Sequence, residues 1–339
     1  MKVLLINKYH FLKGGAERVY LDTKKVLEDN GHNVICFSME DERNLPSDEA
    51  RFFVANVDFT VMRGWLRKGF RYLYYPKAAK QLAKLLKLHK PDVAHLHNIS
   101  HQLTYSILKP LRKNKVPIVQ TLHDYQVISP NYHLYRKGKI DESCRKHKYF
   151  MCALKRCVRG MFWPSLLATI ELYLYWIMRW PRKVDLYISP SKFLATKFKE
   201  WGFKKQIKII HNFIDCKKFE PNFEVGDYIL SYGRLSREKG VMVLVKAVRK
   251  LPNVKLKIIG VGSEKQRIVN YIKAKQVKNI EVLGPRYGDD LFKLIAGARF
   301  VVIPSKWDEN YPMTVLESMA LGKPVMVSGL GGLKEMVTE

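Results

Sequence analysis

The stretch Trp307–Val327 reads WDENYPMTVLESMALGKPVMV, and it decides the fold. The apolar residues 300–303 before it predict a short buried strand, and a polar loop follows. Pro312 suits the first turn of a helix, where a missing N–H costs nothing. Apolar residues in 315–320 follow helical spacing, and a glycine and a proline then end the helix before another apolar run. The stretch therefore predicts a strand–loop–helix–strand unit.

The predicted helix begins near Met313 and Thr314, and the free N–H groups of its first turn can hold an anion. Glu309 precedes this turn and Glu317 lies one turn inside it. Two carboxylates repel a bare phosphate, but they can accept hydrogen bonds from hydroxyl groups attached to that phosphate, as in a nucleotide-sugar. The alternative is that the helix dipole favours acidic residues at this end.

Length and charge suggest two domains and an anionic partner. A chain of 339 residues exceeds one typical core. The net charge is +29, and residues 1–215 hold 39 Lys and Arg against 18 Asp and Glu, which is +21 of it. The sequence predicts binding to nucleic acid or to an anionic membrane.

The start of the chain and its cysteines indicate a reducing compartment. Met1 leads directly into an apolar strand-like run, without the pattern of a signal peptide. Five cysteines in a chain of this size favour free thiols in the cytoplasm over a disulfide framework. Three of them, at 144, 152 and 157, could bind zinc with Asp141 or His147, although a metal-free loop is favoured.

The first domain begins with a strand–helix–strand pattern. Strands are predicted at 3–7 and 33–38, and Gly14 and Gly15 open the helix between them. This places the glycine pair at the carboxyl edge of the sheet, where open α/β sheets bind ligands. The pair either lets a phosphate approach the backbone or simply forms a loop.

Histidines mark the next two predicted strands, 91–97 and 117–124. Alternation puts His95 and His97 on one face of the first strand, as a metal pair or as packed side chains. His123 stands at the end of the second strand, at the ligand edge, and is a candidate functional residue.

Two segments are suited to a membrane surface. Residues 61–90 mix aromatic side chains with Arg63, Arg67 and Lys68, which is typical of interfacial segments but also of an ordinary surface helix. Residues 161–180 are the most apolar stretch, but Glu171 opposes a membrane span. We expect this helix to lie on the bilayer or to line an acceptor-lipid groove; the alternative is a core helix.

The segment ENYPMTVLESMALGKPV, with seven residues between Glu309 and Glu317, resembles the signature of family 4 glycosyltransferases of the GT-B fold. The resemblance extends from KVLLINKYHFLKGGAERV at the start to GGLKEMV at the end. It implies two Rossmann-like α/β domains facing a central cleft, at 1–215 and 227–339, joined by a linker at 216–226. Relatives continue beyond the GGLKE motif, so the second domain is expected to be incomplete at its C-terminus.

The resemblance also implies roles for particular residues. His123, in a TLHD motif, would lie near the transferred sugar, and Arg234 and Lys239 would hold the donor diphosphate, where charge and helix dipole combine. Glu309 would contact the donor sugar and Glu317 the ribose. The remaining positions expected at the nucleotide-sugar are Gly14, Gly15, Arg286, Asn310, Tyr311, Pro312, Met313 and Thr314.

The implied activity is retaining transfer of a sugar from a nucleotide diphosphate to an acceptor hydroxyl, with a lipid-linked saccharide of surface polysaccharide synthesis as acceptor. The sequence has no Asp-x-Asp motif, so neither a metal nor another cofactor is expected. We expect a cytoplasmic protein, peripheral on the inner face of an anionic cell membrane, and no nucleic acid partner. The alternatives are a nucleotide-sugar epimerase or hydrolase, a basic nucleic-acid-binding protein, and an inactive membrane scaffold.

Overall fold

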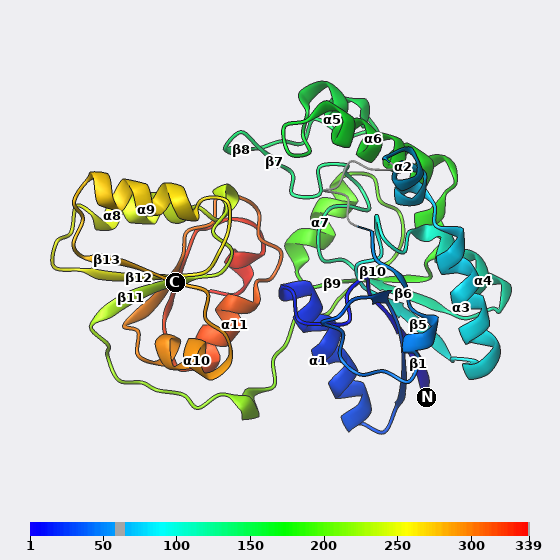
Figure 1. Ribbon diagram of the computed structural model, residues 1–339, viewed down its shortest axis with the longest axis horizontal. Coiled ribbons are helices and arrows are strands. Elements are labelled where there is room, and N and C mark those ends of the chain that lie inside the picture. Colours follow the sequence, from blue (N-terminus) through cyan, green and yellow to red (C-terminus); the bar gives the residue numbers. More distant parts are fainter. Residues whose placement is uncertain (58–64, 338–339) are drawn as a thin grey trace. The chain divides into compact units, whose positions relative to one another are not determined.

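A computed structural model describes residues 1–57 and 65–337 (Figure 1). The chain divides into two compact units. Unit 1 comprises Met1–Leu134 and Asp141–His211, and unit 2 comprises Tyr135–Ile140 and the chain from Asn212 onward. Each unit contains a parallel sheet with helices packed against it, as the sequence predicts for the α/β class.

The described part of unit 1 has a six-stranded sheet in the order β10-β9-β6-β5-β1-β2. Its strands are β1 (Lys2–Ile6), β2 (Asn33–Phe37), β5 (Val93–Leu96), β6 (Ile118–Thr121), β9 (Leu186–Ser189) and β10 (Ile207–Ile209). The strand order reverses between β1 and β5, and open sheets bind ligands at such a point. Strand β10 lies at the edge of this sheet, and its pairing with β9 ends at Ser189.

Side chains of β1 alternate between two apolar layers. Val3 and Leu5 pack with Tyr20 of the first helix, whereas Leu4 and Ile6 belong to the larger core on the other face of the sheet. The helices of unit 1 are α1 (Gly15–Asp29), α2 (Trp65–Leu73), α3 (Pro76–His89), α4 (Leu108–Lys113), α5 (Phe150–Lys155), α6 (Phe162–Ile177) and α7 (Lys192–Glu200).

Some parts of the first half differ from the simple predicted pattern. Arg63, in the predicted basic and aromatic segment, lies outside the described residues, while most of that segment forms α2 and α3. Two small two-stranded sheets were not predicted: β3 (Met39–Glu40) with β4 (Val54–Ala55), and the antiparallel pair β7 (Tyr135–Arg136) with β8 (Lys139–Ile140). Across the described ranges, the helices are too short or too polar to cross a membrane.

Unit 2 repeats the layered arrangement. Its five-stranded sheet has the order β13-β12-β11-β14-β15, with β11 (Tyr228–Tyr232), β12 (Lys255–Ile259), β13 (Ile280–Gly284), β14 (Phe300–Ile303) and β15 (Val325–Val327). Figure 1 shows α8 (Val241–Val248) and α9 (Lys265–Ala274) on one face of this sheet, and α10 (Gly288–Ala296) and α11 (Met313–Ala320) on the other. Each helix pair packs on its own apolar layer. The strand predicted at 300–303 and the helix start at Met313 are confirmed.

Candidate active site

The loops that follow β11 and β14 are tightly joined at the carboxyl edge of the unit 2 sheet. These two strands are neighbours, and the strand order reverses between them. Gly240 has φ +70°, and a Cβ there would lie 1.9 Å from the Pro304 carbonyl oxygen. The Lys306 N–H donates to the Glu238 carbonyl at 2.8 Å. Glycine is therefore required at 240 both for its backbone conformation and for the close approach of the two loops.

An ion pair connects these loops. Lys239 Nζ lies 2.6 Å from Glu309 Oε1, and Ser305 Oγ donates to the same oxygen at 2.5 Å. Glu309 is only 4% exposed. Burial by itself opposes ionisation, but the charge of Lys239 and hydrogen bonds from Lys239, Ser305 and Trp307 outweigh it and lower the pKa of Glu309. The site thus contains a buried, ionised carboxylate beside an ammonium group.

A glycine pair from the GGLKE motif holds the backbone around Glu309. The Gly332 N–H donates to the Glu309 carbonyl at 2.6 Å. A Cβ at Gly332 would lie 1.9 Å from the Asn310 carbonyl oxygen, and one at Gly331 would lie 2.4 Å from the Glu309 carbonyl oxygen. The sequence did not predict this positioning role, although the Gly-Gly pair of the motif could have indicated it.

The first turn of α11 lies beside the start of the β11 loop. Pro312 precedes the helix in an extended conformation, with φ −72° and ψ 134°. A Cβ at Gly233 would lie 4.0 Å from the Thr314 methyl group. The Tyr232 hydroxyl donates to the Thr314 carbonyl at 2.8 Å and lies 3.3 Å from Glu317 Oε2. Tyr232 therefore positions Glu317 near the helix start. The sequence did not predict this role, because Tyr232 follows the pattern of an ordinary strand residue.

The other predicted site residues of unit 2 lie at different distances from the ion pair along the sheet edge. Arg234 is exposed, with Nη2 3.3 Å from Glu238 Oε1, on the same loop as Lys239. Arg286 is also exposed and follows β13, two strands away from β11, so the structure does not bring it to the ion pair. Asn310 is buried, and the Tyr311 carbonyl accepts a hydrogen bond from Asn212 at 2.8 Å.

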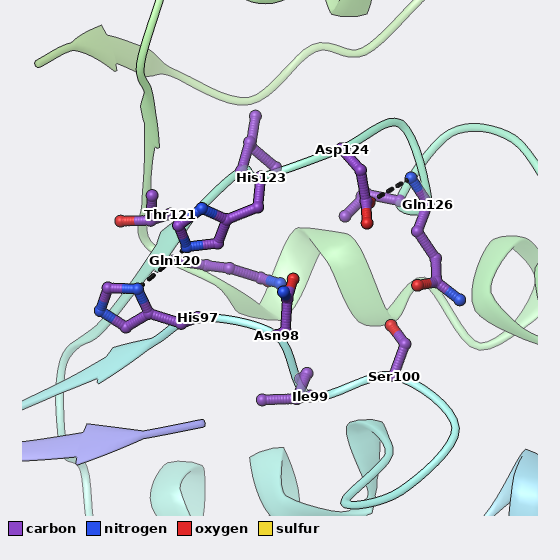
Figure 2. Close-up of a pocket in the computed structure, with 11 residues that line it drawn as sticks. His97, Asn98, Ile99, Ser100, Gln120, Thr121, His123, Asp124 and Gln126 are labelled. Carbon is purple, nitrogen blue, oxygen red and sulfur yellow. Dashed lines mark hydrogen bonds between the residues drawn. The ribbon is translucent and has the colours of Figure 1, made fainter. Parts of the chain in front are cut away.

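Unit 1 brings His95, His97 and His123 together near the carboxyl ends of β5 and β6. Figure 2 shows His97 and His123 facing each other, and His97 Nδ1 lies 3.0 Å from His123 Nε2. His95 Nε2 lies 2.7 Å from Thr121 Oγ1. Burial lowers the pKa of His95 to about 4, and burial with the charges of His95 and Lys8 lowers the pKa of His123 to about 3. Both imidazoles are therefore neutral at pH 7.

The loop after His123 is fixed by Asp124. Its Oδ1 accepts a hydrogen bond from the Gln126 N–H at 2.9 Å (Figure 2), and burial raises its pKa. The hollow lined by these residues has a volume of about 10 Å³, which is room for one water-sized group rather than a sugar ring. Gly14 and Gly15 are exposed at the start of α1, after β1, as the sequence predicts for the ligand edge.

The cysteines at 144, 152 and 157 lie together in unit 1. Hydrogen bonds with Cys144 and Cys157, together with burial, raise the pKa of Cys152, so that it stays a thiol. Thiolates, not thiols, bind zinc. The part of the chain that the structure describes has no group of three or more His, Cys, Asp or Glu side chains arranged to hold a metal ion.

Comparisons with known proteins identify the family. Residues 13–218 match Glycosyltransferase Family 4, and residues 214–339 match Glycosyl transferases group 1. An uncharacterised 42.6 kDa protein in the cps region of Klebsiella pneumoniae is 25% identical, over 99% of this chain and 87% of that protein. The O-antigen biosynthesis glycosyltransferase WclY of Escherichia coli is 24% identical, over 94% of this chain and 77% of its own.

The solved structures show the fold class. Anabaena HepE, crystallised with UDP and glucose, aligns over all of this chain and 83% of its own, with a TM-score of 0.67 and 19% identity. The two parallel-sheet units are thus those of a GT-B protein. The chain belongs to glycosyltransferase family 4 and is a glycosyltransferase related to enzymes of polysaccharide biosynthesis.

Proposed function

We propose that this glycosyltransferase moves a sugar from a nucleotide-diphosphate donor to an acceptor hydroxyl with retention of anomeric configuration. The Lys239–Glu309 ion pair, close to the loop that leads into α11, is the observation that carries the proposal. It would provide a cation for the phosphates and a carboxylate for the sugar hydroxyls within one site. The UDP and glucose bound to the structural neighbour HepE support a nucleotide-sugar donor.

Charge on the departing diphosphate is the main obstacle to the reaction. Arg234, Lys239 and the N–H groups at Met313 and Thr314 would stabilise it, and groups already in place need little reorganisation. Lys239 is paired with Glu309 before a donor binds. When Lys239 turns to a phosphate, the oxygens of Glu309 become available to the hydroxyl groups of the donor sugar. Donor binding would thus replace the Lys239–Glu309 ion pair by contacts of Lys239 with phosphate and of Glu309 with the sugar.

Several other groups would complete donor binding. Glu317 would accept hydrogen bonds from the ribose, since Tyr232 holds it beside the first turn of α11. Neutral His123 would hydrogen-bond the transferred sugar. We propose no metal or other cofactor, because the two cations and the helix N-terminus can replace a divalent ion at the diphosphate. No covalent nucleophile is assigned.

The acceptor is proposed to be a lipid-linked saccharide at the cytoplasmic face of the cell membrane. The likeness to an O-antigen biosynthesis glycosyltransferase supports a surface polysaccharide as the product. The net charge of +21 in residues 1–215 supports an anionic membrane as the location.

A thermal-shift screen with UDP- and GDP-sugars tests the donor. A specific donor raises the melting temperature by mass action, by an amount that depends on its concentration relative to Kd. The screen is repeated with Lys239→Met and with the exposed Lys306→Met as matched control. Stabilisation should be lost only in Lys239→Met. If no nucleotide-sugar stabilises the wild-type protein, the proposed donor is wrong, and release of free sugar without an acceptor would instead indicate a hydrolase.

A further inference from the structure

The helices α5 and α6 expose an unusual amount of apolar surface. They pack on each other within unit 1 (Figure 1). Trp163 is 70% exposed, Leu154 67% and Ile177 64%. We name the α5–α6 face by its exposed large apolar residues, which are Phe150, Leu154, Met161, Phe162, Trp163, Ile170, Trp176, Ile177 and Met178. Exposed apolar side chains gathered on two packed helices are typical of an interaction surface.

Helical spacing places three residues of this face on one stripe of α6. Trp163, Ile170 and Ile177 recur every seven residues and therefore lie along one side of the helix. The opposite side is buried and contains Ser165, Ala168, Thr169, Glu171, Leu172 and Tyr175. An apolar stripe normally faces a core, but this one faces solvent while the more polar side is packed inside. The stripe is therefore a candidate binding surface for a partner.

Charge selects the partner. Residues 145–183 contain nine Lys and Arg, whereas their one acidic residue, Glu171, is fully buried. The exposed basic residues around the α5–α6 face are Arg145, Lys146, Lys148, Arg156, Arg159, Arg179, Arg182 and Lys183. The nearby Asp141 and Glu142 are already paired with Lys155 and Lys197. Two copies of the chain would bring like charges together at this face, which disfavours self-association.

An anionic bilayer fits both the exposed apolar stripe and the basic residues around it. Its phosphates attract the basic border, and its interface accommodates tryptophan and aliphatic side chains. We propose that the α5–α6 face docks on an anionic phospholipid bilayer, with Trp163, Ile170 and Ile177 at the boundary between headgroups and acyl chains.

The buried side of α6 connects this docking surface with the histidine end of the sheet. Glu171 Oε2 lies 3.2 Å from His101 Nδ1, and Tyr175 donates to Glu171 Oε1 at 2.5 Å. His101 belongs to the loop after β5, and its ring also contacts the Gln126 side chain from the loop after β6. Docking of α6 would therefore hold the loops that carry His97 and His123 next to the bilayer. This docking proposal rests on the proposed membrane-bound acceptor, but the docking itself does not require catalysis.

Flotation with phospholipid vesicles tests the proposal. The full chain is mixed with vesicles of phosphatidylcholine, with or without about one-third phosphatidylglycerol, at low and high salt. We expect binding to the anionic vesicles, weakened by salt and reduced about tenfold or more in the double variant Trp163→Ser/Ile177→Ser. The matched control is Phe223→Ser/Val225→Ser, which replaces two residues of unit 2 that are 80% and 77% exposed. It should bind vesicles as the wild-type protein does.

Two outcomes would overturn the docking proposal. One is equal vesicle binding by the wild-type protein and the Trp163/Ile177 variant. The other is a wild-type dimer in solution that the variant converts to monomer, which would make the face a self-association surface. Melting curves of both variants show whether they fold. The nucleotide-sugar thermal shift, measured on the same samples, keeps the two proposals separate: vesicle binding without donor stabilisation sinks the donor proposal and leaves the docking surface in place.

Discussion

Lys239 Nζ and Glu309 Oε1 lie 2.6 Å apart although 70 residues separate them in the chain. Glu309 is buried, so Lys239 supplies the charge that keeps its carboxylate ionised inside the protein. Removal of one partner of a buried pair leaves an uncompensated charge and costs more than the pair itself contributes. The contact therefore predicts effects on both stability and activity.

Lys239→Met should leave the Glu309 carboxylate without its main partner. We expect a loss of roughly 3 kcal/mol in the free energy of unfolding of unit 2 and a fall of about 100-fold or more in kcat/KM. Denaturant unfolding and transfer assays measure the two effects. Lys306→Met removes an exposed lysine of the loop after β14 and should change neither quantity. Wild-type activity in Lys239→Met would show that this cation does not serve the diphosphate.

Glu309→Gln keeps the shape of the side chain and removes its charge. We expect transfer to be abolished while donor binding is largely kept, because Arg234, Lys239 and the helix start remain. Donor binding is measured by titration calorimetry and transfer by product formation. The exposed Glu281→Gln serves as control and should behave as the wild-type protein does. Full transfer by Glu309→Gln would remove Glu309 from the reaction.

The neutral histidines of unit 1 predict a pH-dependent stability. The folded-state pKa values of His95 and His123, about 4 and about 3, lie below the unfolded value near 6.5, and burial lowers the pKa of His97 as well. The unfolded chain therefore binds protons first as the pH falls. Stability should be full above pH 6.5 and should decrease between pH 6.5 and 4, by up to about 1.4 kcal/mol per pH unit for each histidine.

Urea unfolding between pH 7.5 and 4.5 measures this slope. His123→Asn removes one of the three groups and should make the slope shallower by about one proton. Parallel slopes for wild type and His123→Asn would contradict the neutral, buried state of His123.

Gly240→Ala should disturb the two site loops. The added Cβ would lie 1.9 Å from the Pro304 carbonyl oxygen, in a backbone conformation with φ +70°. We expect a loss of about 3 kcal/mol or more in stability, with reduced donor binding, because backbone must move. Gly288 also has positive φ, +54°, but a Cβ added there would meet no atom within 4 Å. Gly288→Ala should therefore report the conformational cost by itself, about 1 kcal/mol, and a similar small loss at 240 would disprove the clash.

Much of the fold followed from local patterns. Apolar runs predicted the central strands, and Pro312 and Gly322 flank the helix of the opening stretch, which runs from Met313 to Ala320. These predictions worked because parallel strands buried on both faces have apolar runs, while proline and glycine act on the backbone next to them. The same patterns could not show the short pairs β3–β4 and β7–β8, which have too few residues for any periodicity.

The sequence by itself determined the two α/β halves, the edge positions of His123 and Glu309, and the excess of positive charge in the first half. Only the tertiary structure decided which of these groups touch: Lys239 with Glu309, His97 with His123, and Gly332 with the backbone of Asn310. It also decided that α6 buries Glu171 and exposes Trp163. Contacts of this kind depend on which loops meet at a sheet edge, and that is set by strand order and close packing rather than by the spacing of residues along the chain.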